Sequence, residues 1–198
     1  MKKKILLLVI ALVLVTALAC LAACDHYASS LQNIQSLLKA DYSEIVLNVE
    51  TKTNGITLNG NYTLTFDGDK TTVVYEFDRL NELDVNEENA DSYLTRVKGS
   101  AVVENGKVVQ GDTSVDLPQE VNFSGMSFKQ AFFTNATTTN AKFEADVSNP
   151  KGFTGNNSLA CTNMHVKVLH KANALTQMII TYVAQNGSNV TLTYLFTK

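Results

Sequence analysis

The hydrophobic positions of this chain follow three different patterns in turn. A mostly apolar run covers Ile5 to Ala19, directly after Met1-Lys2-Lys3-Lys4. A stretch with helical spacing follows between Ser30 and Ala40, and from Glu44 onward apolar and polar residues mostly alternate one by one. A period near 3.6 marks an amphipathic helix, and a period of two marks a strand with one buried face. The pattern therefore predicts an apolar leader, a helix and a β-rich remainder.

The helical stretch has a start signal and a single apolar stripe. Ser29 and Gln32 have the spacing of a capping box, so the helix is expected to begin there. A helix with one apolar stripe needs a sheet or another helix to cover that stripe. The residues on the stripe are Leu31, Ile34, Leu37 and Leu38.

Alternation and turn signals predict about nine strands after the helix. Asn54-Gly55 and Asn105-Gly106 are hairpin dipeptides, and Gly60 inside a strand suggests a bulge or a bend. The first strand runs from Glu44 to about Asn54. The others are expected over Ile56–Phe66, Val73–Phe77, Tyr93–Glu104, Lys107–Gln110, Ala141–Val147, Met164–His170, Leu175–Ala184 and Val190–Phe196.

A short second helix is predicted between the two groups of strands. Ser127 and Gln130 again have capping-box spacing, and Phe128, Ala131 and Phe132 would share a face of a helix over Ser127–Phe133. The polar run Thr134–Asn140 is expected to end that helix. The fold class is therefore α+β: one large, curved antiparallel sheet with an N-terminal amphipathic helix and a short second helix.

The apolar leader ends in the tetrapeptide Leu21-Ala22-Ala23-Cys24, which indicates a signal peptide and its cleavage site. The tetrapeptide resembles the lipobox of bacterial lipoproteins at all four positions. The resemblance implies cleavage before Cys24, attachment of diacylglycerol to its thiol, and anchoring on the extracytoplasmic side of the cell membrane. An uncleaved apolar anchor and ordinary secretion are the alternatives. The expected organisation is a leader over 1–23, a tether over 24–28 and one domain over 29–198.

Charge and cysteine content narrow the classes of partner. Removing three lysines with the leader leaves 13 basic residues against 19 acidic ones, a side-chain balance of −6. Nucleic acid is therefore not an expected partner, because no basic patch is available for its phosphates. With Cys20 removed and Cys24 lipidated, Cys161 is the one thiol left, so no intramolecular disulfide can form. Cys161 is predicted to be a small buried residue, with a reactive thiol as the alternative.

No catalytic or metal-binding motif is visible. His26 lies in the tether, and His165 and His170 are five residues apart, which points them to opposite faces of a strand. The acidic segment Asp84–Glu88 lacks the glycine of an EF-hand loop, and Thr95 stands where the terminal Glu belongs. We therefore expect a non-catalytic protein with no cofactor and no metal site.

Two hypotheses about function remain, and neither sets an oligomeric state. The element order, a helix after the lipidated end and then a long meander, is similar to that of the LolA and LppX group of lipid-handling proteins. That similarity implies a carrier or sensor of an apolar ligand. The strands also offer more apolar surface than two short helices cover. A hydrophobic ligand beneath the first helix would contact Leu37, Leu64, Tyr75 or Phe128. The alternative is a surface module that binds an envelope protein or glycan through polar Asn and Thr faces.

Overall fold

The computed structural model describes residues 27–81, 93–104, 107–111 and 125–198. Within these ranges, ten strands form one antiparallel sheet, and the helices beside it are small, so the fold is broadly α+β with the sheet dominating. The elements are β1 (Glu44–Thr53), β2 (Ile56–Asp67), β3 (Lys70–Leu80), β4 (Leu94–Glu104), β5 (Lys107–Gly111), η3 (Gln130–Phe132), β6 (Phe133–Thr138), β7 (Lys142–Val147), α3 (Pro150–Thr154), β8 (Cys161–Lys171), β9 (Ala174–Ala184) and β10 (Asn189–Thr197).

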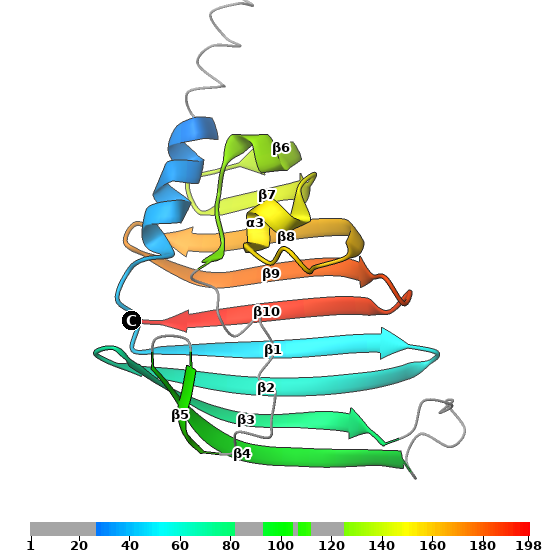
Figure 1. Cartoon of the computed structure of the whole chain (residues 1–198). Coiled ribbons are helices and arrows are strands. Elements are labelled where there is room, and N and C mark those ends of the chain that lie inside the picture. The colour runs from blue at the N-terminus through cyan, green and yellow to red at the C-terminus, as the bar shows by residue number, and fades with distance from the viewer. Residues whose placement is uncertain (1–26, 82–92, 105–106, 112–124) are drawn as a thin grey trace, which may run out of the picture.

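The sheet consists of two meanders joined in its middle (Figure 1). Strands β1 to β5 pair in sequence order, as do β6 to β10, and β1 pairs with β10 to connect the two groups. Glu44 lies opposite Thr197 and Lys52 opposite Asn189 along this central seam. The sheet is not closed, because β5 and β6 stand at its two edges.

The hairpin between β1 and β2 confirms the predicted turn. Asn54 and Gly55 both have positive φ, 49° and 80°, and the flanking Thr53 and Ile56 are paired. This geometry fits a two-residue type I′ turn, which matches the twist of the strands. The second predicted hairpin dipeptide, Asn105-Gly106, lies outside the described residues.

Residues 27–37 are helical and lie over the half of the sheet formed by β6 to β9 (Figure 1). The predicted apolar stripe is confirmed, since its four residues are at most 7% exposed. The predicted N-cap is wrong, because residues 27 and 28 are already helical and Ser29 lies inside the helix. The ring of Tyr27 stacks on Phe143 with 6.3 Å between centroids, so packing on the sheet extends the helix beyond its sequence signal.

Tyr42 fastens the end of this helix to the sheet. Its hydroxyl donates a hydrogen bond to the carbonyl oxygen of Leu37 at 2.8 Å. The hydroxyl oxygen of Tyr42 in turn accepts a hydrogen bond from the backbone N–H of Leu175, at the start of β9, at 2.9 Å. One buried oxygen therefore satisfies a free carbonyl at the helix end and an N–H of the sheet. Burial raises the pKa of Tyr42, and the Leu175 N–H opposes that rise.

The predicted second helix over Ser127–Phe133 is wrong. Only a 3-10 turn over Gln130–Phe132 is present, and Phe133 already belongs to β6. The backbone N–H of Phe128 donates to Oε1 of Gln35 at 2.7 Å, and that of Ser127 donates to Phe153 O at 2.8 Å. These tertiary hydrogen bonds take the place of a helical start. The shared face is also absent, since Phe128 is buried while Ala131 is exposed and Phe132 is half-buried.

The strand residues that form the core are those that the alternation predicted to point inward. Ile45, Leu47 and Val73 are fully buried, whereas their opposite-phase neighbours are half-buried or exposed. Gly60 is not a bulge in the pairing with β1, which passes through it without a register shift. Its missing Cβ makes room for an aromatic ring instead, because a Cβ there would lie 2.9 Å from Cε2 of Tyr62.

Two elements were not expected. The run Thr134–Asn140 was predicted to end a helix, yet β6 covers most of it as an edge strand, so the sheet has ten strands rather than about nine. The loop expected over Ser148–Asn157 contains the one-turn helix α3. Asn149 caps that helix by accepting a hydrogen bond from the N–H of Gly152 at 3.0 Å, and Gly155 ends it with φ of 72°.

Candidate functional site

The four proposed ligand contacts lie in the packed core. Leu37, Leu64, Tyr75 and Phe128 are 7%, 3%, 3% and 5% exposed and belong to one apolar cluster. Phe128 forms edge-on contacts with Phe143 and Phe153, with ring centroids 5.8 Å and 5.3 Å apart. These side chains are therefore close-packed with their neighbours in the core.

The opposite face of the sheet, which we call the outer face, carries ordered rows of polar side chains. Strand pairing places them side by side at about 4.8 Å from one strand to the next. One row runs Arg96, Asp78, Asn59, Glu50, Thr191, Thr181, His165 and Asp146. A second, in which Ile179 is the one apolar member, runs Lys98, Glu76, Asn61, Asn48, Thr193, Ile179, Lys167 and Glu144.

A hollow of about 360 Å³ lies where these rows cross β2, β1 and β10, and we call it the polar furrow. Asn61 Nδ2 donates a hydrogen bond to Asn48 Oδ1 at 2.7 Å across its floor. The short Asn and Thr side chains leave this depression between longer charged ones. The furrow is lined by Asn48, Val49, Glu50, Asn59, Gly60, Asn61, Glu76, Arg96, Thr191 and Thr193.

An ion-pair cluster borders the furrow on β3 and β4. Nε of Arg96 lies 3.0 Å from Oδ1 of Asp78 and 3.3 Å from Oε1 of Glu76, and Nζ of Lys98 lies 3.1 Å from the same Glu76 oxygen. Asp78 also accepts a hydrogen bond from the N–H of Asn59 at 2.9 Å. Exposed pairs of this kind add little stability, about 0–1 kcal/mol each. Their main effect is to hold a guanidinium and two carboxylates in fixed positions at the furrow's edge.

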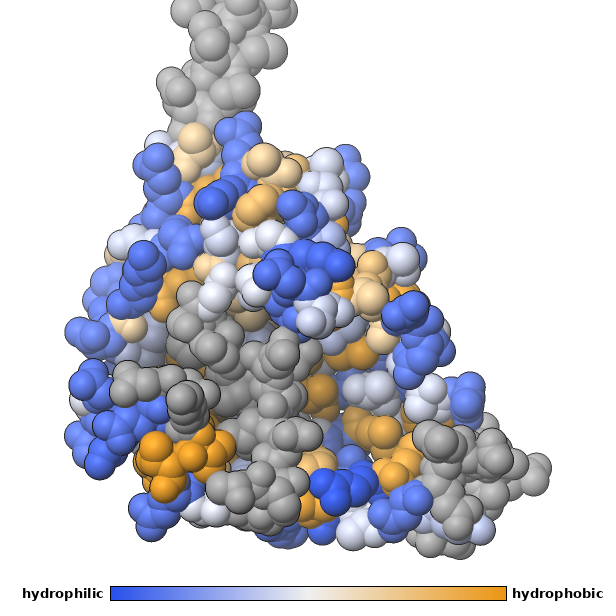
Figure 2. Space-filling model, in the orientation of Figure 1, coloured by the Kyte–Doolittle hydropathy of each residue, from blue (hydrophilic) through white to orange (hydrophobic). Residues whose placement is uncertain are grey.

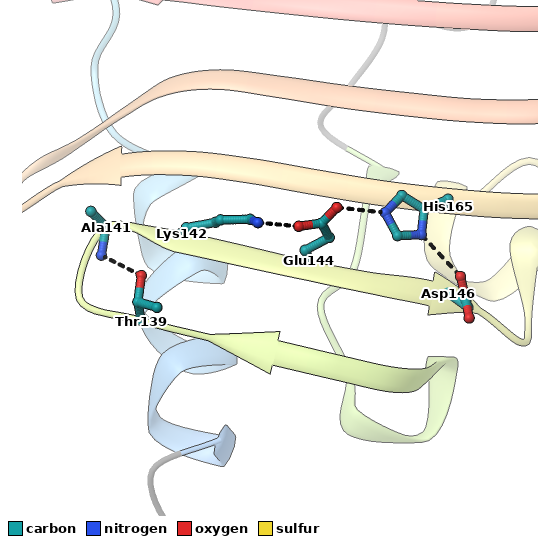
Figure 3. A network of polar contacts seen from close by, with 6 residues as sticks. All are labelled: Thr139, Ala141, Lys142, Glu144, Asp146 and His165. Carbon is teal, nitrogen blue, oxygen red and sulfur yellow. Dashed lines mark hydrogen bonds and ion pairs between the residues drawn. The ribbon is translucent and has the colours of Figure 1, made fainter.

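A second network crosses β7 and β8 on the same outer face (Figure 3). The ring of His165 lies between two carboxylates, with Nδ1 2.9 Å from Asp146 Oδ1 and Nε2 3.2 Å from Glu144 Oε1. Lys142 pairs with the other oxygen of Glu144. Lys142, and then His165, lower the pKa of Glu144. The pKa of Asp146 is lowered first by the amide of Asn135 and then by His165.

The two histidines of β8 occupy opposite faces, as predicted. His165 is on the outer face, whereas His170 is 7% exposed on the inner face, with Nδ1 3.4 Å from Lys171 O. Within the described ranges, no group of three or more His, Cys, Asp or Glu residues is placed to hold a metal ion. In the same ranges, no helix has the length and apolar character needed to span a membrane.

A second hollow, of about 660 Å³, lies at the end of the sheet where β8 begins and β9 ends. Cys161 is on its wall and is half-buried, and burial raises the pKa of its thiol. The predicted lipid-attachment residue Cys24, together with His26 and the acidic segment Asp84–Glu88, lies outside the described residues.

Sequence reasoning missed the polar furrow. The polar phase of each strand was visible as Asn48, Asn59, Asn61, Thr191 and Thr193, but the sequence does not show which strands are neighbours. Only the pairing of β1 with β10 brings residues near 48 beside residues near 193. The furrow can be recognised in the sequence only when that strand order is known.

The sequence matches no family model and no curated protein. Solved structures found by structural comparison include the dehydratase domain from the terminal module of the rifamycin polyketide synthase, at 12% identity over 78% of this chain and 74% of that one, with a TM-score of 0.19. They also include the erythromycin dehydratase, at 10% identity over 79% and 73% of the two chains, with a TM-score of 0.17. Similarity at these TM-scores carries no argument about the fold or the function of this protein.

Proposed function

We propose that the protein is a lipid-anchored extracytoplasmic binding module that holds a hydroxyl-rich glycan of the cell envelope in the polar furrow. The observation that carries the proposal is the furrow itself, about 360 Å³ of open space lined mostly by residues with amide, hydroxyl or charged side chains. By contrast, Leu37, Leu64, Tyr75 and Phe128, the side chains predicted to contact a hydrophobic ligand, are buried in the core. This contrast favours a polar ligand on the outer face.

The chemistry of the furrow suits a glycan better than a protein. Stable protein interfaces need a desolvated centre, usually with aromatic or large aliphatic anchors. The furrow's described lining contains no aromatic residue, and the side chain of its one aliphatic residue, Val49, packs against the apolar core. The Asn amides, Glu carboxylates and Arg guanidinium are planar groups that can donate or accept paired hydrogen bonds. Neighbouring hydroxyls of a sugar ring match such pairs.

A titration followed by side-chain amide resonances tests the glycan. The mature chain carrying Cys24→Ser would be titrated with soluble glucan, mannan and N-acetylglucosamine oligomers. We expect at least one of them to shift the side-chain amides of Asn48, Asn59 and Asn61. The double variant Asn48→Ala/Asn61→Ala should weaken binding about tenfold or more, since a lost hydrogen bond in a polar site costs about 1 kcal/mol or more. Ser100→Ala, exposed on the same face outside the furrow, is the matched control.

Two results would count against the glycan. One is a set of Asn side-chain resonances that do not move with any of the oligomers. The other is equal binding by the double variant and by Ser100→Ala, which would place the site elsewhere on the molecule.

The membrane attachment is supported by the lipobox and is tested at Cys24. Cys24→Ala should give an uncleaved or freely released protein, because the thiol that carries the lipid is gone. The wild-type chain should enter the detergent phase of a phase-separation experiment with acyl mass on its N-terminal peptide. Recovery of the wild type in the aqueous phase, without that mass, would overturn the anchor.

Binding of a hydrophobic ligand is the second candidate function, and a different observation favours it. The hollow of about 660 Å³ at the end of the sheet has an aliphatic side, formed by Leu159, Cys161, Val183 and Ala184. Mass spectrometry of the purified mature chain for co-purifying lipid tests this candidate without any assumption about the ligand.

A further inference from the structure

The hollow at the end of the sheet lies between two structural units. The start of β8, the end of β9 and the start of β10 meet at the same side of the molecule, next to α3 (Figure 1). The residues before and within α3 form one wall, and the strand ends form the other. A volume of about 660 Å³ is within the range of small-molecule sites. This hollow is distinct from the polar furrow, because the two have no lining residue in common.

Hydrogen bonds within each wall hold it in place. On one side, Asn149 caps α3, and the N–H of Ser148 donates to Phe132 O at 2.8 Å. On the other side, the N–H of Ala184 donates to Ser188 O at 2.8 Å, and that of Ser188 donates to Asn186 Oδ1 at 3.1 Å. The space between the walls is therefore formed before any ligand arrives, which lowers the entropic cost of binding.

The lining combines an aliphatic side with one cation. Leu159, Cys161 and Ala184 pack against the apolar core and present their remaining surface to the hollow. Lys151, on α3, lines the opposite wall, and its ammonium forms no ion pair with any described residue. An aliphatic surface favours an alkyl chain, and an unpaired ammonium favours a negative group at the end of that chain.

We propose that this hollow binds a single-chain anionic amphiphile, such as an aliphatic carboxylate, with its chain against Leu159, Cys161 and Ala184 and its charge beside Lys151. The inference deepens the second candidate function and does not depend on the glycan. It moves the hydrophobic site from beneath the N-terminal helix to the end of the sheet. An alkyl chain there also covers the Cys161 thiol. The rate at which that thiol reacts therefore reports whether the hollow is occupied.

The test follows the alkylation of Cys161 by N-ethylmaleimide in the mature chain with Cys24→Ser, where Cys161 is the one remaining thiol. Decanoate, below its micelle concentration, should slow the alkylation at least fivefold. Decyltrimethylammonium, with the same chain and the opposite charge, should slow it less than twofold. Lys151→Glu should reverse that preference, and Ala160→Phe, which puts a ring into the hollow from an exposed position, should abolish the protection by decanoate.

Val74→Phe, which adds the same ring to an exposed position on the outer face, is the matched control and should leave the protection intact. Equal protection by the two amphiphiles would overturn the proposal, as would an unchanged preference in Lys151→Glu. No protection by decanoate would overturn it as well. None of these results changes the side-chain amide shifts that test the polar furrow, so failure of one site is distinguishable from failure of the other.

Discussion

The inner and outer faces of the sheet are made by the same strands but have different surroundings. On the inner face, side chains such as Phe143 and Val166 are fully buried, and the helix and α3 lie on this side of the sheet (Figure 1). On the outer face, the neighbours of these residues, such as Glu144 and His165, form hydrogen bonds and ion pairs that reach water. The described core is thus on one side of the sheet.

Because of this difference, the inner face determines the stability of the domain, whereas the outer face is available for recognition. Inner residues contribute through burial and close packing, so their replacement costs stability. Outer residues contribute little to stability, because exposed polar pairs exchange readily with water. The outer face is therefore free to vary in sequence without unfolding the domain. Figure 2 shows that the division is not complete on the inner side, where an apolar patch lies over β5 and Val109 is 54% exposed.

The largest effect should come from the aromatic group on the inner face. Phe143→Ala removes a fully buried ring that contacts Phe128 and Phe133, and we expect a loss of about 3–5 kcal/mol in the free energy of unfolding. Thr65→Ala, exposed on the outer face, should change it by less than about 0.5 kcal/mol. Urea unfolding measures both. A loss under 1 kcal/mol at Phe143 would contradict the assignment of a packed inner face.

A similar contrast applies to the helix that covers this face. Leu37→Ala should cost about 2–5 kcal/mol if the helix packs on the sheet. Asn59→Ala, on the outer phase of β2, should cost less than about 0.5 kcal/mol in the same thermal or urea unfolding experiment. Equal losses in the two variants would show that the helix or the strand phase is misassigned.

A smaller loss is expected for the hydroxyl that joins helix and sheet. Tyr42→Phe keeps the ring, but it leaves the Leu37 carbonyl and the Leu175 N–H without their partner. The expected cost is about 1–3 kcal/mol, the range for a buried group left unsatisfied. Hydrogen exchange of the Leu175 amide should also become faster. Unchanged exchange at that amide would argue against the contact.

The smallest effects concern the carboxylates of the outer face. Glu144 and Asp146 have pKa values below their ordinary 4.5 and 3.8, so their ionised forms favour the folded state. Their contribution is present above those ordinary values and is lost as the pH falls through the lowered ones. Carboxyl-carbon NMR titration should show both shifts, and Asn135→Ala should raise the pKa of Asp146. An unchanged Asp146 titration in that variant would exclude the amide as the main cause.

The inner face could be predicted from sequence because its signals are local. Period-two alternation and turn signals located nine of the ten described strands, and helical spacing identified the stripe of Leu31 and Ile34. The failures have tertiary causes. Gln35 and Phe153 hold the segment that was expected to be a helix, and β6 is a strand because it pairs with β7, although its sequence is mainly Thr and Asn.

The candidate sites could not be predicted, because each depends on which strands are neighbours. The residues of the polar furrow are ordinary outer-phase positions until β10 is placed beside β1. The hollow beside Cys161 needs α3, which occupies a segment expected to be a loop. Both sites are thus formed by segments whose sequences contain no motif that predicts a binding site.

The pairing of β1 with β10 along the central seam also determines when the domain can finish folding. The N–H of Ser43 donates to Thr197 O at 2.9 Å, and these two residues are 154 positions apart. If the chain crosses a membrane N-terminus first, β1 to β5 emerge early, and β1 has a free edge until the last strand arrives. A pause late in translocation, or loss of the last ten residues, would leave that edge open to pairing with another chain.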